Sequence, residues 1–410
     1  MKSVTSKIAA GLILGLALHG PACADAFEQI LRTAALKNGL LPVDQLFDDR
    51  DAKLADVGKL FFESENVSLN GGMACRTCHL DEFGSADGLP NAVGVFGENR
   101  GPDRAKSDGR IVPRNTLPLW GRGAKGFDVF FWDGKVDFSN GRRLSQFGDQ
   151  DPSADPLVTA AHLPAVEIRE MIVDDDLVGR HKAESQDSAS ELYTRIFERL
   201  ILKEPEAVQT LSERLSRPIE QLSFLDVARA LASFIRSDFR LRDTKFHQFV
   251  FGPRELTEDE LAGGIIFYGK GKCVNCHHGP YFSDFDFHAI PFPQLGFGKN
   301  GFGVDYGRFN VTFDSEDLYR FRTPPLFNVL KTAPYGHSGS LPDVGSAVRA
   351  HFDPLRGVEP SKMSELERHE FFRRIAKSGE EFINFAFLSD SEIEKLVAFL
   401  GTLSMESHID

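Results

Sequence analysis

The chain has 410 residues, and its hydrophobic fraction of 41% is that of a soluble globular protein. The formal net charge of −13 argues against a nucleic acid or an anionic membrane surface as partner. A chain of this length exceeds what one hydrophobic core supports, so we expect two domains of ordinary size.

Residues 1–24 are typical of a secretory signal peptide. Lys2 and Lys7 supply a positive start, residues 8–18 form an apolar run, and Ala22-Cys23-Ala24 offers a cleavage site. The apolar run is too short to cross a bilayer and no other segment comes close, so we expect no membrane-spanning helix. Cys23 leaves open the alternative of a lipoprotein, although the leucine expected three residues before it is missing.

Two C-x-x-C-H motifs, at 75–79 and 273–277, carry the strongest chemical signal. Two thiols three residues apart can each form a thioether with a vinyl group of one haem, and the histidine that follows can bind the iron. A zinc site or a thioredoxin-type dithiol would not need that histidine. We therefore expect two covalently attached c-type haems and, because such attachment occurs outside the cytoplasm, a periplasmic protein. The expected haem-binding residues are Cys75, Cys78, His79, Cys273, Cys276 and His277.

Apolar residues spaced three and four apart predict helices over 25–36, 51–62, 190–202, 222–239, 258–268 and 389–403. Long Gly- and Pro-rich loops between them, at 84–126 and 292–310, need something else to fill the core, and two haems would do so. Residues 59–62 precede the first haem motif much as 264–267 precede the second. We predict a mainly α fold with two cytochrome c-like helical haem domains and long irregular loops, spanning 25–245 and 246–410.

Short motifs in a fixed order support one family. The first half contains 114–116 (RNT), 131–134 (FWDG), 144–146 (LSQ) and 170–171 (EM), and the second half contains 256–263 (LTEDELAG), 279–280 (GP), 305–308 (DYGR), 321–326 (FRTPPL) and 332–339 (TAPYGHSG). Together with the two haem motifs, they make the chain resemble the bacterial dihaem cytochrome c peroxidases and their relatives of the MauG type, from about residue 61 to residue 403.

The resemblance implies a role for each matching residue. His79 and His277 would be the proximal ligands, with the N-terminal haem as the peroxide site and the C-terminal haem as a store or relay of electrons. Trp132 would lie between the haems. Gln146 and Glu170 would form the polar pair over the peroxide haem, with Glu170 as the general acid/base. From the residues alone, Glu170 could also be a surface carboxylate and Trp132 a core aromatic.

The resemblance also implies a Ca²⁺ ion between the domains, held by Asn115, Thr332 and Pro334, two of them through backbone carbonyls. The alternative for Asn115 is a turn residue after Pro113.

Two departures from the ordinary peroxidases bear on the mechanism. No histidine lies between His79 and His162, so the loop that usually caps the peroxide iron lacks its ligand, and we expect a five-coordinate haem there. The alternative is that His162 takes the capping role. The distal ligand of the C-terminal haem is usually Met or Tyr, but the matching position is His351, which would give a bis-His iron of lower potential. Otherwise His351 is a surface helix residue.

Both departures favour an H₂O₂-dependent dihaem oxidoreductase of the MauG type, which oxidises Trp or Tyr side chains of a partner protein. The first alternative is a reductively activated cytochrome c peroxidase, which detoxifies peroxide with electrons from a small cytochrome c or cupredoxin. The second is a plain dihaem electron-transfer protein, which would leave Gln146 and Glu170 without a task. The resemblance leaves a homodimer open.

Overall fold

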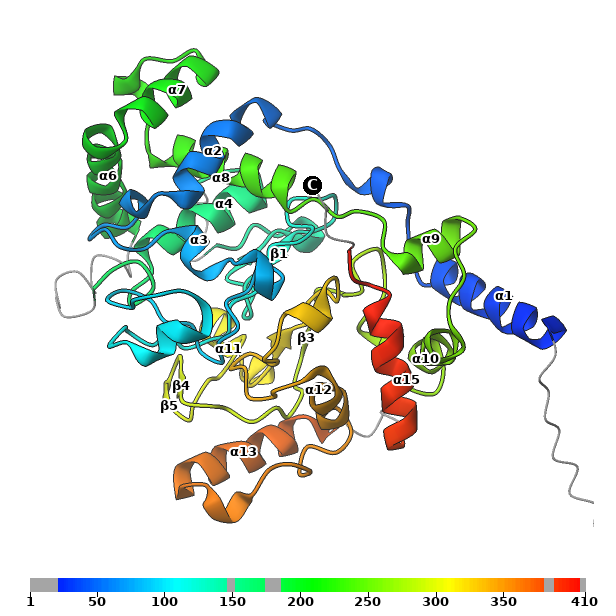
Figure 1. Cartoon of the computed structure of the whole chain (residues 1–410). Helices are drawn as coiled ribbons and strands as arrows, with labels where there is room; N and C mark the ends of the chain where they lie inside the picture. Colours follow the sequence, from blue (N-terminus) through cyan, green and yellow to red (C-terminus); the bar gives the residue numbers. More distant parts are fainter. Residues whose placement is uncertain (1–20, 146–151, 174–185, 380–386, 406–410) are drawn as a thin grey trace, which may run out of the picture.

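The structure is a computed structural model, and it describes residues 21–145, 152–173, 186–379 and 387–405. Within these ranges the chain is mainly helical, with long irregular connections and a few very short strands (Figure 1). The helices are α1 (Pro21–Lys37), α2 (Ala55–Glu63), α3 (Cys75–Cys78), α4 (Pro156–His162), α6 (Gln186–Lys203), α7 (Pro205–Leu215), α8 (Phe224–Asp238), α9 (Lys245–Phe251), α10 (Glu258–Tyr268), α11 (Phe309–Thr312), α12 (Val344–Ala350), α13 (Glu365–Lys377) and α15 (Asp390–Gly401).

The strands pair into short antiparallel ribbons that brace the loops. They are β1 (Val129–Phe130), β2 (Val136–Asp137), β3 (Phe287–His288), β4 (Phe297–Gly298), β5 (Gly301–Phe302) and β6 (Phe321–Arg322). β1 pairs with β2, β3 with β6 and β4 with β5. The helices that the apolar spacing predicts are confirmed as α1, α2, α6, α8, α10 and α15, and the mainly α fold class is confirmed with them.

The helix pair α2 and α8 forms the frame of the first half of the chain. The backbones approach so closely that a Cβ on Gly58 would overlap the carbonyl oxygen of Ala230. α8 begins at a capping box between Ser223 and Asp226, and its buried face includes Leu231. This tight crossing holds the segment that leads into the first haem motif.

The pair α10 and α15 repeats this arrangement in the second half. A Cβ on Gly263 would overlap the carbonyl oxygen of Lys395. Gly58 and Gly263 immediately precede the similar segments 59–62 and 264–267, so the internal similarity of the sequence corresponds to two equivalent helix crossings. In each half the C-x-x-C-H motif therefore follows the first helix of the same kind of helix pair.

The N-terminal helix α1 packs against the second half of the chain. It contacts α10 and α9, and Leu31 on α1 lies beside Gly264 (Figure 1). The domain limits at 25–245 and 246–410 stay a prediction. Among the described residues, no helix has the length and apolar character needed to cross a membrane.

Candidate functional site: two cavities behind the C-x-x-C-H motifs

The first motif folds as one helical turn followed by an anchored histidine. α3 carries Cys75 and Cys78, and the next residue, His79, leaves the helix. Nδ1 of His79 hydrogen-bonds the carbonyl oxygen of Ser85 at 2.8 Å, which leaves Nε2 as the nitrogen able to bind a metal. Burial lowers the pKa of His79 to about 4, so the ring is neutral near pH 7, which is the state that ligates iron.

The second motif has the same local design. Cys273–Asn275 form a 3₁₀ turn, and Nδ1 of His277 hydrogen-bonds the carbonyl oxygen of Phe282 at 2.9 Å. Burial lowers the pKa of His277 to about 4 as well. The carbonyl that anchors each histidine lies only five or six residues further along the chain. The local sequence therefore suffices to orient each imidazole.

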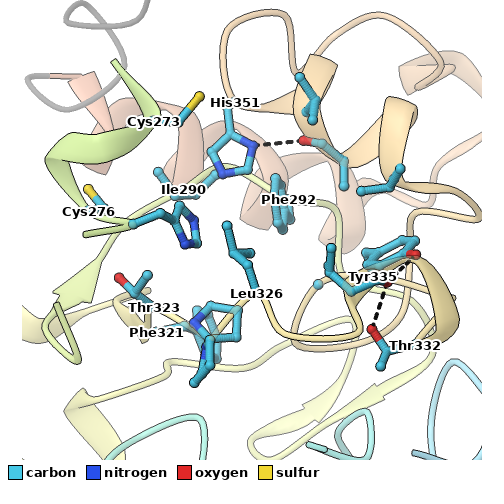
Figure 2. A pocket seen from close by; sticks show the side chains of 18 of the residues that line it. Cys273, Cys276, Ile290, Phe292, Phe321, Thr323, Leu326, Thr332, Tyr335 and His351 are labelled. Carbon is cyan, nitrogen blue, oxygen red and sulfur yellow. Dashed lines mark hydrogen bonds between the residues drawn. The ribbon is translucent and has the colours of Figure 1, made fainter. Parts of the chain in front are cut away.

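Each motif lines its own cavity. Cys75, Cys78 and His79 face a cavity of about 1260 Å³, which we call the first cavity. The cysteines and histidine of the second motif line a cavity of about 210 Å³, which we call the second cavity (Figure 2).

No disulfide joins any of the four motif cysteines, so all four thiols are available for thioether bonds. Burial raises the pKa of Cys75 and of Cys273 to about 12, which keeps both thiols protonated near neutral pH. Paired thiols at an apolar cavity, each pair with a neutral imidazole oriented by a backbone carbonyl, are the donor set that a covalently attached haem needs. The residues present therefore fit one c-type haem in each cavity.

His351 lies at the C-terminal end of α12. It lines the second cavity beside Phe292, with the two rings edge-on at 5.1 Å (Figure 2). Nδ1 of His351 hydrogen-bonds the carbonyl oxygen of Ala347 at 2.7 Å. His277 lines the same cavity, and a positive charge on His351 would add to the burial that lowers the pKa of His277. The arrangement fits an axial ligand, and this role stays a prediction.

Trp132 lines both cavities. Its Nε1–H donates to the carbonyl oxygen of Asn115 at 2.9 Å, and its own carbonyl accepts from the backbone N–H of Arg322. The indole of Trp132 is thus hydrogen-bonded to Asn115 of the first half of the chain, and its backbone to Arg322 of the second half. The relay role of Trp132 stays a prediction.

Glu170 lines the first cavity, near the motif thiols. Burial, with a smaller contribution from the charge of Glu167, raises the pKa of Glu170 to about 7. The turn that carries Glu170 passes so close to Gly94 that a Cβ there would overlap the carbonyl oxygen of Arg169. A carboxyl group with a pKa near neutrality can both accept and release a proton. Gln146, its predicted partner, lies outside the described residues.

An ionic network beside the first cavity was not assigned from the sequence. Arg114 donates to both carboxylate oxygens of Asp305 at 2.9 Å and to Asp133 at 2.6 Å. Lys135 donates to Glu167. Arg114 holds the pKa of Asp133 well below its usual range despite complete burial. Arg114, Asp133 and Asp305 lie in the motifs at 114–116, 131–134 and 305–308. Their opposite charges were the sequence signal from which this network could have been predicted.

The three residues predicted to hold Ca²⁺ lie together along the second cavity. The side-chain amide of Asn115 donates to the carbonyl oxygen of Pro334 at 2.9 Å, and the hydroxyl of Thr332 donates to Val329. This brings an amide and a backbone carbonyl of the expected type side by side. The calcium site remains a prediction.

His162 packs away from the first cavity. Its ring lies against that of Tyr193, tilted by 36° with 3.7 Å between centroids, and burial lowers the pKa of His162 to about 4. Of the described residues that line the first cavity, His79 is the one histidine. The capping alternative therefore finds no support in the packing of His162.

The paired motifs, the helical frame and the two cavities define a dihaem c-type protein. Residues 52–255 match the family model described as di-haem cytochrome c peroxidase. The chain belongs to the di-haem cytochrome c peroxidase and MauG family, and as such it is a peroxidase-type oxidoreductase with two c-type haems.

Relatives with assigned names include both branches of this family. The chain is 27% identical over 358 residues to the methylamine utilization protein MauG of Methylorubrum extorquens, covering 85% of this chain and 78% of that protein. It is 25% identical over 300 residues to the cytochrome c551 peroxidase of Pseudomonas aeruginosa, covering 72% and 70%. A solved MauG-like protein associated with microbial copper homeostasis superposes with a TM-score of 0.62 at 21% identity, covering 90% and 93%. The two cytochrome c-like domains are confirmed by this likeness of fold.

Proposed function

We propose that the protein is an H₂O₂-dependent dihaem oxidoreductase of the MauG type, which reacts with peroxide before any electron is supplied. The observation that carries this proposal is the composition of the first cavity. His79 is the one histidine among its described lining residues, so no second histidine of the described part of the chain lines this cavity, where a reductively activated peroxidase would need one to cap the iron.

The side chains of the first cavity suit peroxide chemistry. A haem bound there supplies the metal at which peroxide is reduced by two electrons. Glu170, with its pKa near 7, can take the proton from the inner oxygen of peroxide and return it to the outer oxygen, which leaves as water. Glu167 and Lys135 fix the local charge around Glu170. Glu170 therefore moves the proton that the reaction needs, and the charges of Glu167 and Lys135 act on its pKa in opposite directions.

The second cavity suits a centre that exchanges electrons without binding substrate. His277 and His351 both line it, and the rest of its lining is largely apolar. A bis-His iron lacks the thioether that raises haem potential, and so it gives up electrons more readily. Trp132, which lines both cavities, is the proposed route between the two centres. The oxidising equivalents would then act on a side chain of a partner protein.

Export, calcium and assembly complete the proposal. We infer that residues 1–24 direct the chain to the periplasm, that Asn115, Thr332 and Pro334 hold Ca²⁺, and that a homodimer is the assembly to look for. The partner class is a redox protein, either a small electron donor or a protein substrate.

The decisive experiment is an EPR and optical spectrum of the as-isolated diferric protein, before and after one equivalent of H₂O₂. The proposal expects a high-spin signal beside a low-spin signal, both bleached by peroxide. Two low-spin signals that stay inert until one electron is added would instead identify a reductively activated peroxidase served by a small cytochrome c or cupredoxin. Two low-spin haems inert in both states would identify an electron-transfer protein.

A further inference from the structure

Tyr319 and Glu370 form a buried pair outside both cavities. The hydroxyl of Tyr319 donates to Oε2 of Glu370 at 2.7 Å, and the two side chains are 3% and 4% exposed. The two residues are 51 positions apart in sequence. They meet because α13, which carries Glu370, packs over the loop that carries Tyr319. We propose that Tyr319 is a redox-active tyrosine, oxidised by one electron during turnover while Glu370 takes its phenolic proton.

The acceptor of this hydrogen bond separates Tyr319 from the other tyrosines. All six tyrosines lie within the described residues, and Tyr319 is the one whose hydroxyl donates to a carboxylate. Tyr281 and Tyr335 donate to backbone carbonyls, and the buried hydroxyl of Tyr193 has no hydrogen-bond partner. Loss of an electron makes a phenol strongly acidic, so a carboxylate already in hydrogen-bond contact can receive the proton at once, whereas a backbone carbonyl cannot.

Two cations make this proton transfer necessary. The guanidinium groups of Arg373 and Arg374 lie 5.8 and 5.7 Å from the centre of the Tyr319 ring. A ring that kept its proton after oxidation would carry a positive charge beside two others in a buried site, which is unfavourable. The neutral radical avoids that charge. Arg373 also donates to Oε1 of Glu370 at 3.2 Å and keeps the carboxylate oriented.

The pair lies within reach of the second cavity. Phe321 lines that cavity and stacks on His337 at 3.8 Å, and Tyr319 precedes Phe321 by two residues, so their Cα atoms are within about 8 Å. Tyr319 itself has a positive φ of 62°, a costly conformation for a bulky residue. The ring of Tyr319 also meets the half-buried ring of Tyr306 edge-on, at 5.9 Å between centroids. Tyr319 thus connects the second cavity with a ring nearer the surface.

The step balances as one electron and one proton. The O–H bond of Tyr319 breaks, the proton joins the Glu370 carboxylate, and the electron reduces by one equivalent the centre that peroxide has oxidised. The reverse step, with an electron from a donor, restores the phenol and the carboxylate. The oxidant is H₂O₂, which the family activity supplies, and the inference rests on the proposed function for the route by which its equivalents reach the second cavity.

The test is freeze-quench EPR of the dihaem protein after one equivalent of H₂O₂, in protein labelled with ring-deuterated tyrosine. We expect a tyrosyl radical signal that Tyr319→Phe largely removes, while the haem signals still bleach. Glu370→Gln keeps a hydrogen-bonding oxygen but removes the base, and should slow radical formation about 100-fold. The matched control is Tyr281→Phe, another buried tyrosine with a short hydrogen bond, which should keep the signal.

Each result decides one point. A radical that persists in Tyr319→Phe, or no radical in the wild type while both haem signals bleach, would overturn the inference alone. If peroxide bleaches neither haem signal, the proposed function falls, and flash-generated tris(bipyridine)ruthenium(III), a one-electron oxidant, tests Tyr319 without peroxide. A Tyr319 signal that appears only with this oxidant supports the inference, and its absence overturns it. Thermal melting of each variant distinguishes a redox role of the Tyr319–Glu370 pair from a purely structural one. A structural role alone would change the stability and leave the radical in place.

Discussion

Trp132 and Asn115 are joined by a hydrogen bond of 2.9 Å from the indole N–H to the backbone carbonyl, and both residues line both cavities. The side-chain amide of Asn115 reaches in turn to Pro334 of the second half. Asn115 thus connects Trp132, which lines both cavities, to the segment around Pro334 where we propose calcium. Substitutions at the two residues should therefore have separable effects.

Trp132→Phe should uncouple the two haems. The ring still fills the wall, but the indole hydrogen bond is lost, which costs about 1 kcal/mol of stability. After one equivalent of H₂O₂ we expect the high-spin signal to bleach and the low-spin signal to remain. Trp120→Phe is the control, because Trp120 donates to Gly84 and lines neither cavity. Simultaneous bleaching of both signals in Trp132→Phe would exclude the relay role.

Glu170→Gln should slow the peroxide reaction by about 100-fold or more, because the variant cannot accept a proton. In the wild type, burial raises the pKa of Glu170 to about 7, so its ionised fraction grows as pH rises through that value. The rate should rise with pH and be half-maximal near pH 7, and this dependence should vanish in Glu170→Gln. Stopped-flow absorbance of the haem bands measures both. An unchanged pH profile in the variant would assign the proton transfer to another group.

His351→Met should raise the reduction potential of the second haem by on the order of 0.1 V, because a thioether ligand favours the reduced iron. Spectroelectrochemical titration measures the shift, and the low-spin EPR signal should change with it. His369→Gln is the control, since His369 is an exposed residue of α13. Identical spectra for His351→Met and the wild type would show that His351 is not a ligand.

Removal of calcium should weaken the coupling between the halves. We expect about one Ca²⁺ per chain by elemental analysis, and loss of the peroxide reaction on treatment with a chelator. Added Ca²⁺ should restore the reaction, whereas Mg²⁺, which prefers a tighter octahedral shell, should not. Asn115→Ala should bind less Ca²⁺. If the protein contains no Ca²⁺ and its peroxide reaction is unaffected by the chelator, Asn115, Thr332 and Pro334 are not metal ligands.

Gly58→Ala and Gly263→Ala should each destabilise the protein by about 1–3 kcal/mol or more, because the new Cβ overlaps a backbone carbonyl that cannot rotate away. Gly379→Ala is the control, since a Cβ at this position would meet no atom of the described residues within 4 Å, and it should stay within about 0.5 kcal/mol. Thermal unfolding followed by circular dichroism measures these effects. Wild-type stability in both crossing variants would mean that the helix pairs are looser than the crossings indicate.

Much of the fold followed from local patterns. The helices at 51–62, 222–239 and 258–268 were predicted because apolar spacing is set by residues only three and four positions apart. The internal similarity predicted two equivalent halves, which the crossings at Gly58 and Gly263 confirm. The contact of α1 with α10 was not predicted, because nothing in residues 21–37 specifies which distant helix their apolar face will meet.

The sequence by itself determined the haem attachment, since two thiols and an imidazole within five residues form a complete donor set whatever surrounds them. It also placed Glu170, Trp132 and His351 as candidates. Only the tertiary structure decided that Trp132 lines both cavities, that Glu170 has a pKa near 7, and that Tyr319 donates to Glu370. These properties depend on burial and on charges contributed by segments far apart in the chain, and such contacts exist only once the chain has folded.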